Sequence, residues 1–180
     1  MKSIKIITIF LSVMIFFSCQ KGRERSIQKI EEIESTIKNV KELNKQGELV
    51  YNLEMACTDF ATRFPDDSLA PVFLVRAFEN DMRLNWYERA IGIIDHFIKA
   101  YPEHKKAPEL LFHKAFIYDE NLNNDSKAGE TYRLFIKKYP KHPLVKDAEN
   151  SIKFLGLSPE EILKELEKSN TTADTLTNKP

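Results

Sequence analysis

The 180-residue chain has few of the residues, and none of the motifs, from which most catalytic sites are built. It contains two cysteines, one tryptophan, four histidines and five scattered glycines. The glycines form no phosphate-binding or dinucleotide-binding pattern, and no HExxH, CxxC or clustered-carboxylate motif is present. We therefore expect a protein that is not an enzyme and that uses no metal or cofactor.

An excess of charge of one sign is also missing. The chain has 27 basic and 27 acidic residues, so it lacks the positive field that attracts nucleic acid. Its 42% hydrophobic and 30% charged content is ordinary for a globular protein. No segment shows a convincing strand pattern, because the short β-branched runs lie inside helical patterns, and we predict an all-α fold without a nucleic-acid partner.

The N-terminus carries a basic start followed by an apolar run over residues 6–17. Such a run suits a secretion signal and is shorter than the ~20 residues that a membrane-spanning helix needs. It ends at Phe16-Phe17-Ser18-Cys19, which resembles a bacterial lipobox, the motif in which the cysteine is acylated. The resemblance implies removal of residues 1–18 and a lipid anchor on Cys19. The alternative is an ordinary cleaved signal in which Cys19 is incidental.

The second thiol, Cys57, falls on an apolar helical stripe with Leu53 and Phe60. A free cysteine in such a position usually behaves as a small buried hydrophobe. If Cys19 is acylated, no intramolecular disulfide can form.

An internal repeat of 38 residues dominates the rest of the chain. Residues 77–102 align without a gap with residues 115–140, and eleven of the 26 aligned pairs are identical. A repeat of this length indicates stacked supersecondary units, because one such unit cannot bury its apolar face alone. A third copy of the second helix ends at Pro65, so Pro65, Pro102 and Pro140 each end one helix.

Helical periodicity accounts for most of the chain after the signal. The predicted helices cover residues 26–46, 48–63, 69–82, 86–100, 107–121, 126–138, 143–155 and 159–168. Ser158 and Glu161 form a capping box for the last of them, Asn85 and Asn123–Asp125 supply turn and N-cap chemistry, and the tail 169–180 is expected to be disordered. We assign residues 19–46 to a lipidated amphipathic segment and residues 47–168 to the repeat domain.

The amphipathic segment allows two interpretations. Ile30, Ile33, Ile37 and Val40 follow a heptad spacing, which would suit a short coiled coil. The same stripe would equally suit docking onto the first repeat, and it covers fewer heptads than the ~3–4 typical of a coiled coil.

The second helix of the repeat resembles that of a tetratricopeptide repeat, which has a small residue twelve positions before its terminal proline. Ala90 and Pro102 keep this spacing, as do Ala128 and Pro140. The resemblance implies a solenoid of helical hairpins with a C-terminal capping helix. The repeat-structural positions are Ala90, Phe97, Tyr101 and Pro102 in one copy and Ala128, Phe135, Tyr139 and Pro140 in the next.

The strings around Tyr101-Pro102 and Tyr139-Pro140 are similar to repeats in bacterial envelope proteins of the BamD and CpoB type. This resemblance implies a protein-interaction scaffold, lipid-anchored in the outer membrane and facing the periplasm, which binds envelope proteins or peptides in its repeat groove. A role in outer-membrane protein assembly is one expectation. The alternative is a coiled-coil oligomeric adaptor for envelope or cell-division coordination.

Five residues are candidates for partner contact. Trp86 stands where the next copy has Asn124, and Tyr87 where it has Asp125; either could contact a partner, while Trp86 could equally cap the apolar layer between hairpins. Arg76, Arg83 and Arg89 could line a groove for an acidic peptide or simply form solvated helix faces.

Two repeated pairs suggest chemistry but have simpler explanations. His104 and His142 both lie two residues after a repeat proline and are interpreted as turn residues, not as metal ligands. Asp81 and Asp119 share a repeat position and are interpreted as polar residues at helix C-termini, because this spacing alone does not bring two carboxylates across a cleft.

Overall fold

The computed structural model describes the backbone of residues 2–165 and the side chains of residues 20–42 and 45–165. All regular elements in this part of the chain are helices, which confirms the all-α class. The predicted tail 169–180 and the end of the last predicted helix lie outside the described residues. The helices are α1 (Lys2–Asn39), α2 (Leu43–Arg63), α3 (Ala70–Arg83), α4 (Tyr87–Ala100), α5 (Ala107–Phe116), the π-helical turn η1 (Ile117–Asn121), α6 (Asp125–Lys138) and α7 (Val145–Phe154), with a further helical segment at residues 159–165.

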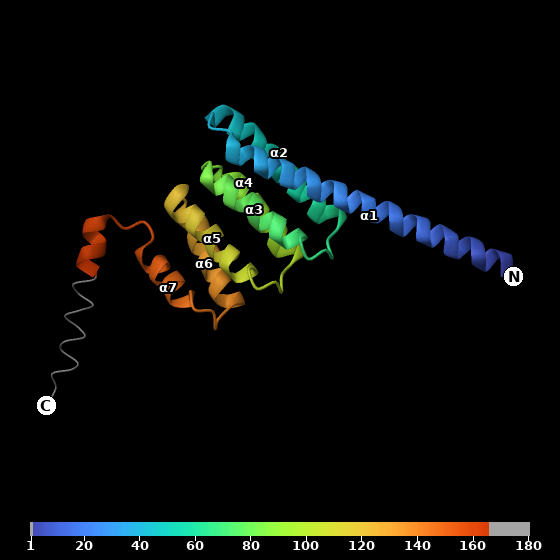
Figure 1. Cartoon of the computed structure of the whole chain (residues 1–180). Coiled ribbons are helices and arrows are strands. Elements are labelled where there is room, and N and C mark those ends of the chain that lie inside the picture. Colours follow the sequence, from blue (N-terminus) through green and yellow to red (C-terminus); the bar gives the residue numbers. More distant parts are fainter. Residues whose placement is uncertain (1, 166–180) are drawn as a thin grey trace. The chain divides into compact units, whose positions relative to one another are not determined.

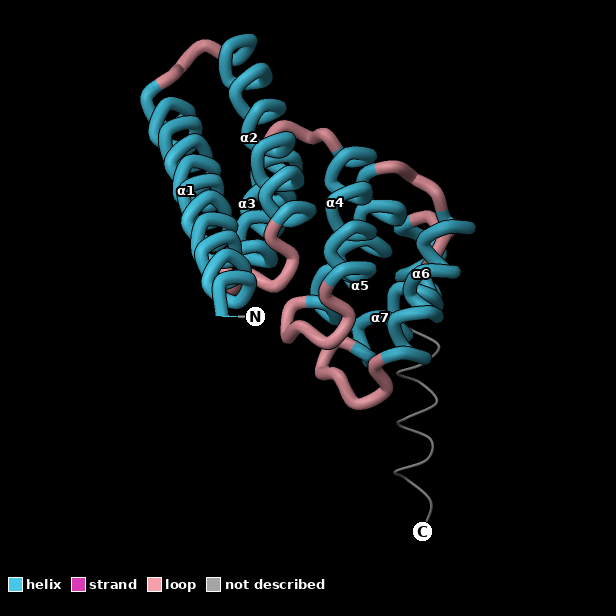
Figure 2. Tube along the Cα trace, turned by 90° about the vertical axis from the view of Figure 1, so that its right-hand side faces the viewer, coloured by secondary structure: helices cyan, strands magenta, loops and turns pink. Residues whose placement is uncertain are grey.

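The chain forms two compact units, residues 1–103 and residues 104–180. In unit 1, α1 packs on α2, α2 on α3 and α3 on α4, and the N-terminal part of α1 projects beyond the other helices (Figure 1). In unit 2, α6 packs against both α5 and α7, and η1 contacts α5 and α6. Short connections join consecutive helices (Figure 2). The predicted domain boundaries stay predictions.

The three second helices, α2, α4 and α6, end in the same way. Each is followed by an aromatic residue with φ −130° and ψ between 57° and 59°, and a proline comes next. The amide of the aromatic residue donates to the carbonyl four residues earlier at 2.7–2.8 Å, which closes the helix before the proline. The sequence repeat is therefore a repeat of backbone geometry. The aromatic residues are Phe64, Tyr101 and Tyr139.

The turn after each proline is also repeated. Asp67, His104 and His142 each lie two residues after the proline, and each side chain accepts a hydrogen bond from the amide two residues further on, at 2.9, 3.1 and 3.3 Å. The Nδ1 atoms of the two histidines act as acceptors, which requires that they carry no proton. These contacts confirm the interpretation of His104 and His142 as turn residues.

Asparagines shape the turns inside the hairpins. Asn85 and Asn123 both adopt positive φ, 59° and 48°, a conformation that asparagine tolerates better than most residues. Asn124 caps α6 by accepting from the amide of Lys127 at 3.1 Å. The predicted capping box is also present: Ser158 N donates to Glu161 Oε2 at 2.8 Å, and Glu161 N donates to Ser158 Oγ at 3.3 Å.

The helix predicted over residues 26–46 is wrong in its C-terminal part. α1 ends at Asn39, Glu42 is extended, and α2 begins at Leu43. The side-chain amide of Gln46 donates to the Val40 carbonyl at 2.5 Å. It thereby provides a hydrogen-bond partner for one of the backbone carbonyls that have none within the helix at its C-terminal end. Val40 and Leu43 are three residues apart, so the apolar spacing runs across the break without marking it.

The predicted helix over residues 107–121 is α-helical only as far as Phe116. In η1 the amide of Leu122 donates to the Ile117 carbonyl, five residues back, at 3.0 Å. The facing helix carries Tyr132, which is fully buried, where the preceding copy carries the smaller Ile94. We attribute the wider turn to the room that this larger ring requires.

Apolar side chains at matching repeat positions form the core. Ala90 and Ala128 are fully buried, and so are the aromatic rings of Phe60, Phe97 and Phe135. Tyr101 and Tyr139 are only half-buried, and their hydroxyl oxygens have no hydrogen-bond partner among the described residues. The main aromatic anchor of each repeat is therefore the phenylalanine four residues before the terminal aromatic residue.

Replacing Phe97 with Ala is expected to destabilise the protein by about 3–5 kcal/mol, because a buried phenylalanine truncated to alanine leaves a cavity. Urea unfolding followed by circular dichroism measures the loss. Met55→Ala is the control in the same unit, since the Met55 side chain is 51% exposed and should change stability by less than about 1 kcal/mol. Equal losses for the two variants would contradict this account of the core.

Candidate partner-binding groove

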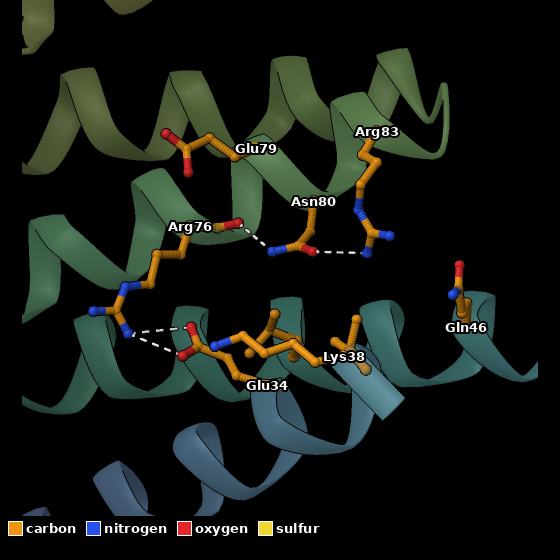
Figure 3. Close-up of a pocket in the computed structure, with 9 residues that line it drawn as sticks. Glu34, Lys38, Gln46, Arg76, Glu79, Asn80 and Arg83 are labelled. Carbon is orange, nitrogen blue, oxygen red and sulfur yellow. Dashed lines mark hydrogen bonds and ion pairs between the residues drawn. The ribbon is translucent and has the colours of Figure 1, made fainter. Parts of the chain in front are cut away.

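A polar groove runs along unit 1 between α1 and α3, with α2 beneath it (Figure 3). Its volume is about 550 Å³. We call it the α1–α3 groove and define it by the residues that line it. They are Glu34, Ile37 and Lys38 from α1, Gln46 and Leu53 from α2, and Arg76, Glu79, Asn80 and Arg83 from α3.

A hydrogen-bonded row of side chains fixes one wall of the groove. Arg76 Nη1 donates to both carboxylate oxygens of Glu34, at 3.1 and 3.2 Å, and so ties α3 to α1. Asn80 donates through Nδ2 to the Arg76 carbonyl at 2.8 Å, and its Oδ1 accepts from Arg83 Nη2 at 3.0 Å. The row therefore holds the Arg83 guanidinium at the groove while leaving that side chain exposed.

Helical spacing explains why these residues share one wall. Arg76, Asn80 and Arg83 are four and three residues apart on α3, so they lie on one face of the helix. Glu34 and Lys38 have the same relation on α1. The floor is apolar, since Ile37 and Leu53 are buried. A polar rim above an apolar floor, with the two exposed cations Lys38 and Arg83, is suited to an amphipathic segment that carries carboxylates.

Arg89 lies in a different environment from the groove. Its Nη2 atom pairs with the carboxylate of Glu54 on α2, and its guanidinium stacks over the rings of Tyr51 and Trp86 at 4.6 and 5.0 Å. Arg89 therefore links α4 to α2 inside unit 1.

The two aromatic candidates, Trp86 and Tyr87, are half-buried at the start of α4. A Cβ atom on Gly47 would lie 3.5 Å from Trp86 Cζ2, so the indole packs against the α2 backbone. Tyr87 donates its hydroxyl to Asn85 Oδ1 at 2.7 Å. The structure thus brings Arg76 and Arg83 together in the groove and gathers Trp86 and Arg89 at a separate α2–α4 contact.

Asp81 is the least expected side chain near this contact. It is completely buried in the last turn of α3, and neither carboxylate oxygen has a hydrogen-bond partner within the described part of the chain. The pKa of Asp81 is raised to about 7, chiefly by burial and also by the nearby Glu54, while Arg89 acts to lower it. The equivalent Asp119 in unit 2 differs, because the hydroxyl of Tyr132 donates to it at 3.3 Å. Ile94 replaces that tyrosine beside Asp81 and cannot donate.

Cys57 is buried in unit 1, which confirms the packing interpretation. Burial raises the pKa of its thiol to about 12, so the reactive thiolate is scarce at neutral pH. Cys19 lies within α1, and its side chain is outside the described ones.

Sequence reasoning did not identify Glu34, Lys38, Gln46 or Asn80 as groove residues. On the sequence they are ordinary polar positions of amphipathic helices, and only the packing of α1 against α2 and α3 brings them together. The alternation of Glu and Lys on α1 contains no signal that separates Glu34 from its neighbours.

Among the side chains that the structure describes, no group of three or more histidine, cysteine, aspartate or glutamate residues is arranged to hold a metal ion. Over residues 20–42 and 45–165, no helix is long and apolar enough to cross a membrane.

No protein-family model matches the chain, and no curated protein sequence matches it significantly.

The buried Asp81 should make stability depend on pH. In the unfolded chain its pKa returns to about 3.9, so folding holds the proton more tightly. The cost of burying the carboxylate is absent below about pH 4, grows as the pH rises toward 7 and is constant above that value. At about 1.4 kcal/mol per pKa unit, the cost at pH 8 is at most about 4 kcal/mol. Asp81→Asn should therefore stabilise the protein at pH 8 more than at pH 5.

Urea unfolding of the wild type and of Asp81→Asn at these two pH values measures the difference. Asp66→Asn is the matched control, because Asp66 is exposed at the end of the same unit. If the free energy of unfolding depends on pH in the same way in the wild type and in Asp81→Asn, Asp81 is not the source of that dependence.

Proposed function

We propose that the protein is a non-catalytic scaffold of the bacterial envelope, anchored by a lipid on Cys19 in the outer membrane and facing the periplasm. Its helical hairpins form a tetratricopeptide-like solenoid that binds envelope proteins or peptides. The α1–α3 groove is the binding site on unit 1, and its partner is a segment with carboxylate side chains. A role in outer-membrane protein assembly fits this proposal.

The repeated backbone geometry supports the assignment to tetratricopeptide-like hairpins. The aromatic-proline end of the second helix and the side-chain-capped turn occur three times, at intervals of 37 and 38 residues. Repeats of this kind commonly use their surfaces to bind extended or helical partners.

The observation that best supports this binding site is the set of hydrogen bonds that runs from Glu34 through Arg76 and Asn80 to Arg83. Side chains that are already held in place lose little entropy when a ligand binds, so the Arg83 guanidinium, held by Asn80, is preorganised to bind a carboxylate. Lys38 supplies a second exposed cation on the other side of the groove.

The alternative of a coiled-coil adaptor finds less support. Of the heptad residues on α1, Ile30 and Ile37 are buried within unit 1, where α1 packs against α2. To form a coiled coil through this stripe, Ile30 and Ile37 would have to leave their present contacts within unit 1.

Charge reversal on both sides of the groove tests the binding site. A photoreactive amino acid at Glu79, an exposed lining residue, is used to crosslink the bound partner in intact cells. Lys38→Glu combined with Arg83→Glu should reduce recovery of that partner at least about tenfold, which corresponds to a loss of about 1.4 kcal/mol.

Lys29→Glu is the matched control for this experiment. Lys29 is exposed on α1, nine residues before Lys38, so the two side chains leave the helix on opposite faces. Loss of the partner with Lys29→Glu alone, or full recovery with the double reversal, would place binding outside the groove.

The anchor has a separate test. Cys19→Ala should move the protein from the membrane pellet to the soluble fraction, because no acyl chain is then attached. Labelled palmitate should enter the wild type and not the variant. Equal labelling of both proteins, or a wild type that carries no acyl mass, would exclude lipidation at this cysteine.

A further inference from the structure

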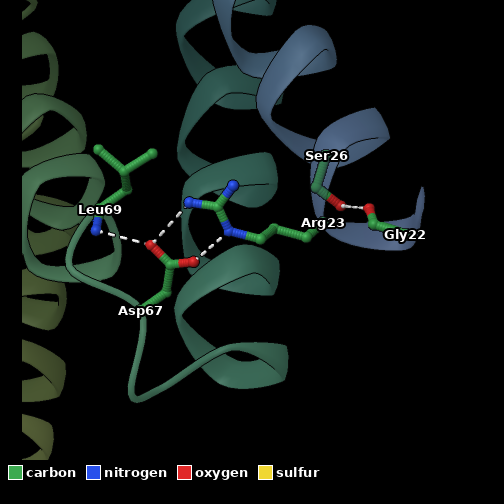
Figure 4. A network of polar contacts seen from close by, with 5 residues as sticks. All are labelled: Gly22, Arg23, Ser26, Asp67 and Leu69. Carbon is green, nitrogen blue, oxygen red and sulfur yellow. Dashed lines mark hydrogen bonds and ion pairs between the residues drawn. The ribbon is translucent and has the colours of Figure 1, made fainter. Parts of the chain in front are cut away.

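Near its middle, α1 is tied directly to the turn between α2 and α3 (Figure 4). Arg23 Nε and Nη2 both bind the carboxylate of Asp67, the second at 3.3 Å. The same carboxylate accepts from the Leu69 amide at 2.9 Å, next to the start of α3. This ion pair lowers the pKa of Asp67, chiefly through the hydrogen bond from Arg23. Within unit 1, α1 is therefore bound to the other helices from residue 23 onward.

The neighbouring residues of α1 are part of the same contact. A Cβ atom on Gly22 would lie 3.5 Å from Arg63 Nη2 at the end of α2. Ser26 Oγ donates to the Gly22 carbonyl at 3.1 Å, and Ile30 is fully buried one turn further on. Packing of α1 on unit 1 thus begins within three residues of Cys19.

The α1 backbone is continuous from Lys2 to Asn39 and includes Cys19. A helix rises about 1.5 Å per residue, so Cys19 and Arg23 are separated by roughly 6 Å along the axis. A flexible tether of polar residues would instead let the folded part move freely at a distance from the bilayer. The sequence between Cys19 and the first contact is too short for such a tether.

We infer that the lipid anchor joins unit 1 without a flexible linker, and that the end of unit 1 bearing the α2–α3 turn lies against the lipid headgroups. This inference rests on the proposed lipidation of Cys19. The partner of this surface is the membrane itself, and the surface is defined by Lys21, Gly22, Arg25, Arg63 and Asp66.

Charge does not attract this surface to the bilayer. Lys21 and Arg25 are exposed there together with Glu24 and Asp66, and Arg63 pairs with Asp59 at 3.2 Å. A polybasic patch would contribute about 1 kcal/mol per cation on anionic lipid, but these charges balance. The contact should therefore depend on the short helical connection and should change little with salt or with lipid charge.

A rigid connection also fixes the height of the groove. Lys38 lies on α1 roughly 28 Å along the helix axis from Cys19. The α1–α3 groove would then be held toward the far end of unit 1, at a limited distance from the bilayer and out of direct contact with it.

The test uses the full-length lipidated protein in proteoliposomes that carry a nitroxide quencher on the lipid headgroup. Asp66→Cys and Lys41→Cys place a fluorophore on exposed sites at opposite ends of α2, and the buried native Cys57 should remain unlabelled. Position 66 should be quenched at least about threefold more than position 41, equally at low and high salt. Intact mass confirms the acyl chains on each preparation.

Insertion of ten Gly and Ser residues between Gln20 and Lys21 is the matched control. It lengthens the connection without changing the folded surface, so it should remove the difference between the two positions. Equal quenching in the lipidated wild type would overturn the inference and leave the anchor intact. A difference that survives the insertion would also overturn it, because the surface would then bind lipid independently of the short connection. Absence of acyl mass would overturn both the anchor and the inference.

Discussion

An aromatic residue followed by proline is the constraint on which the arrangement of these helices depends. The proline ends each second helix at a defined residue, and the preceding backbone adopts the same dihedral angles in all three copies. The phenylalanine four residues before the terminal aromatic residue is fully buried in each copy, as Phe60, Phe97 and Phe135. Because the helix ends repeat in this way, polar residues at matching sequence positions occupy equivalent places in each copy. The copies then differ only in which residue stands at each place.

Local signals in the sequence predicted most of the fold. Proline punctuation, asparagine turns and the Ser158–Glu161 capping box each act over a few residues, and the structure contains them where expected. Two features were missed. The break after Asn39 is invisible to apolar spacing, because the stripe continues in phase across it. The π-helical turn η1, which we attribute to the size of Tyr132 in the facing helix, leaves no pattern in the sequence of its own helix.

The candidate site could be predicted only in part for a related reason. Arg76 and Arg83 were candidates for lining a groove, but the sequence gives no sign that Glu34, 42 residues earlier, is the partner of Arg76. Arg89 was considered together with them only because it is also an arginine. Its guanidinium instead stacks on two aromatic rings and pairs with Glu54. Which side chains pair between two helices depends on how the helices pack. A single sequence can therefore suggest residues that line a groove, but not the contacts between them.

Two ion pairs attach α1 to the rest of unit 1 at separate points along its length. Arg23 binds the turn that opens α3, and Glu34 binds Arg76 within α3. Because α1 is one continuous helix between these points, a displacement at Arg23 must either shift Glu34 or bend the helix. The position of the groove wall is therefore coupled to the end of α1 that precedes Arg23. If that end is held at a membrane, as proposed, the membrane also sets where the groove stands.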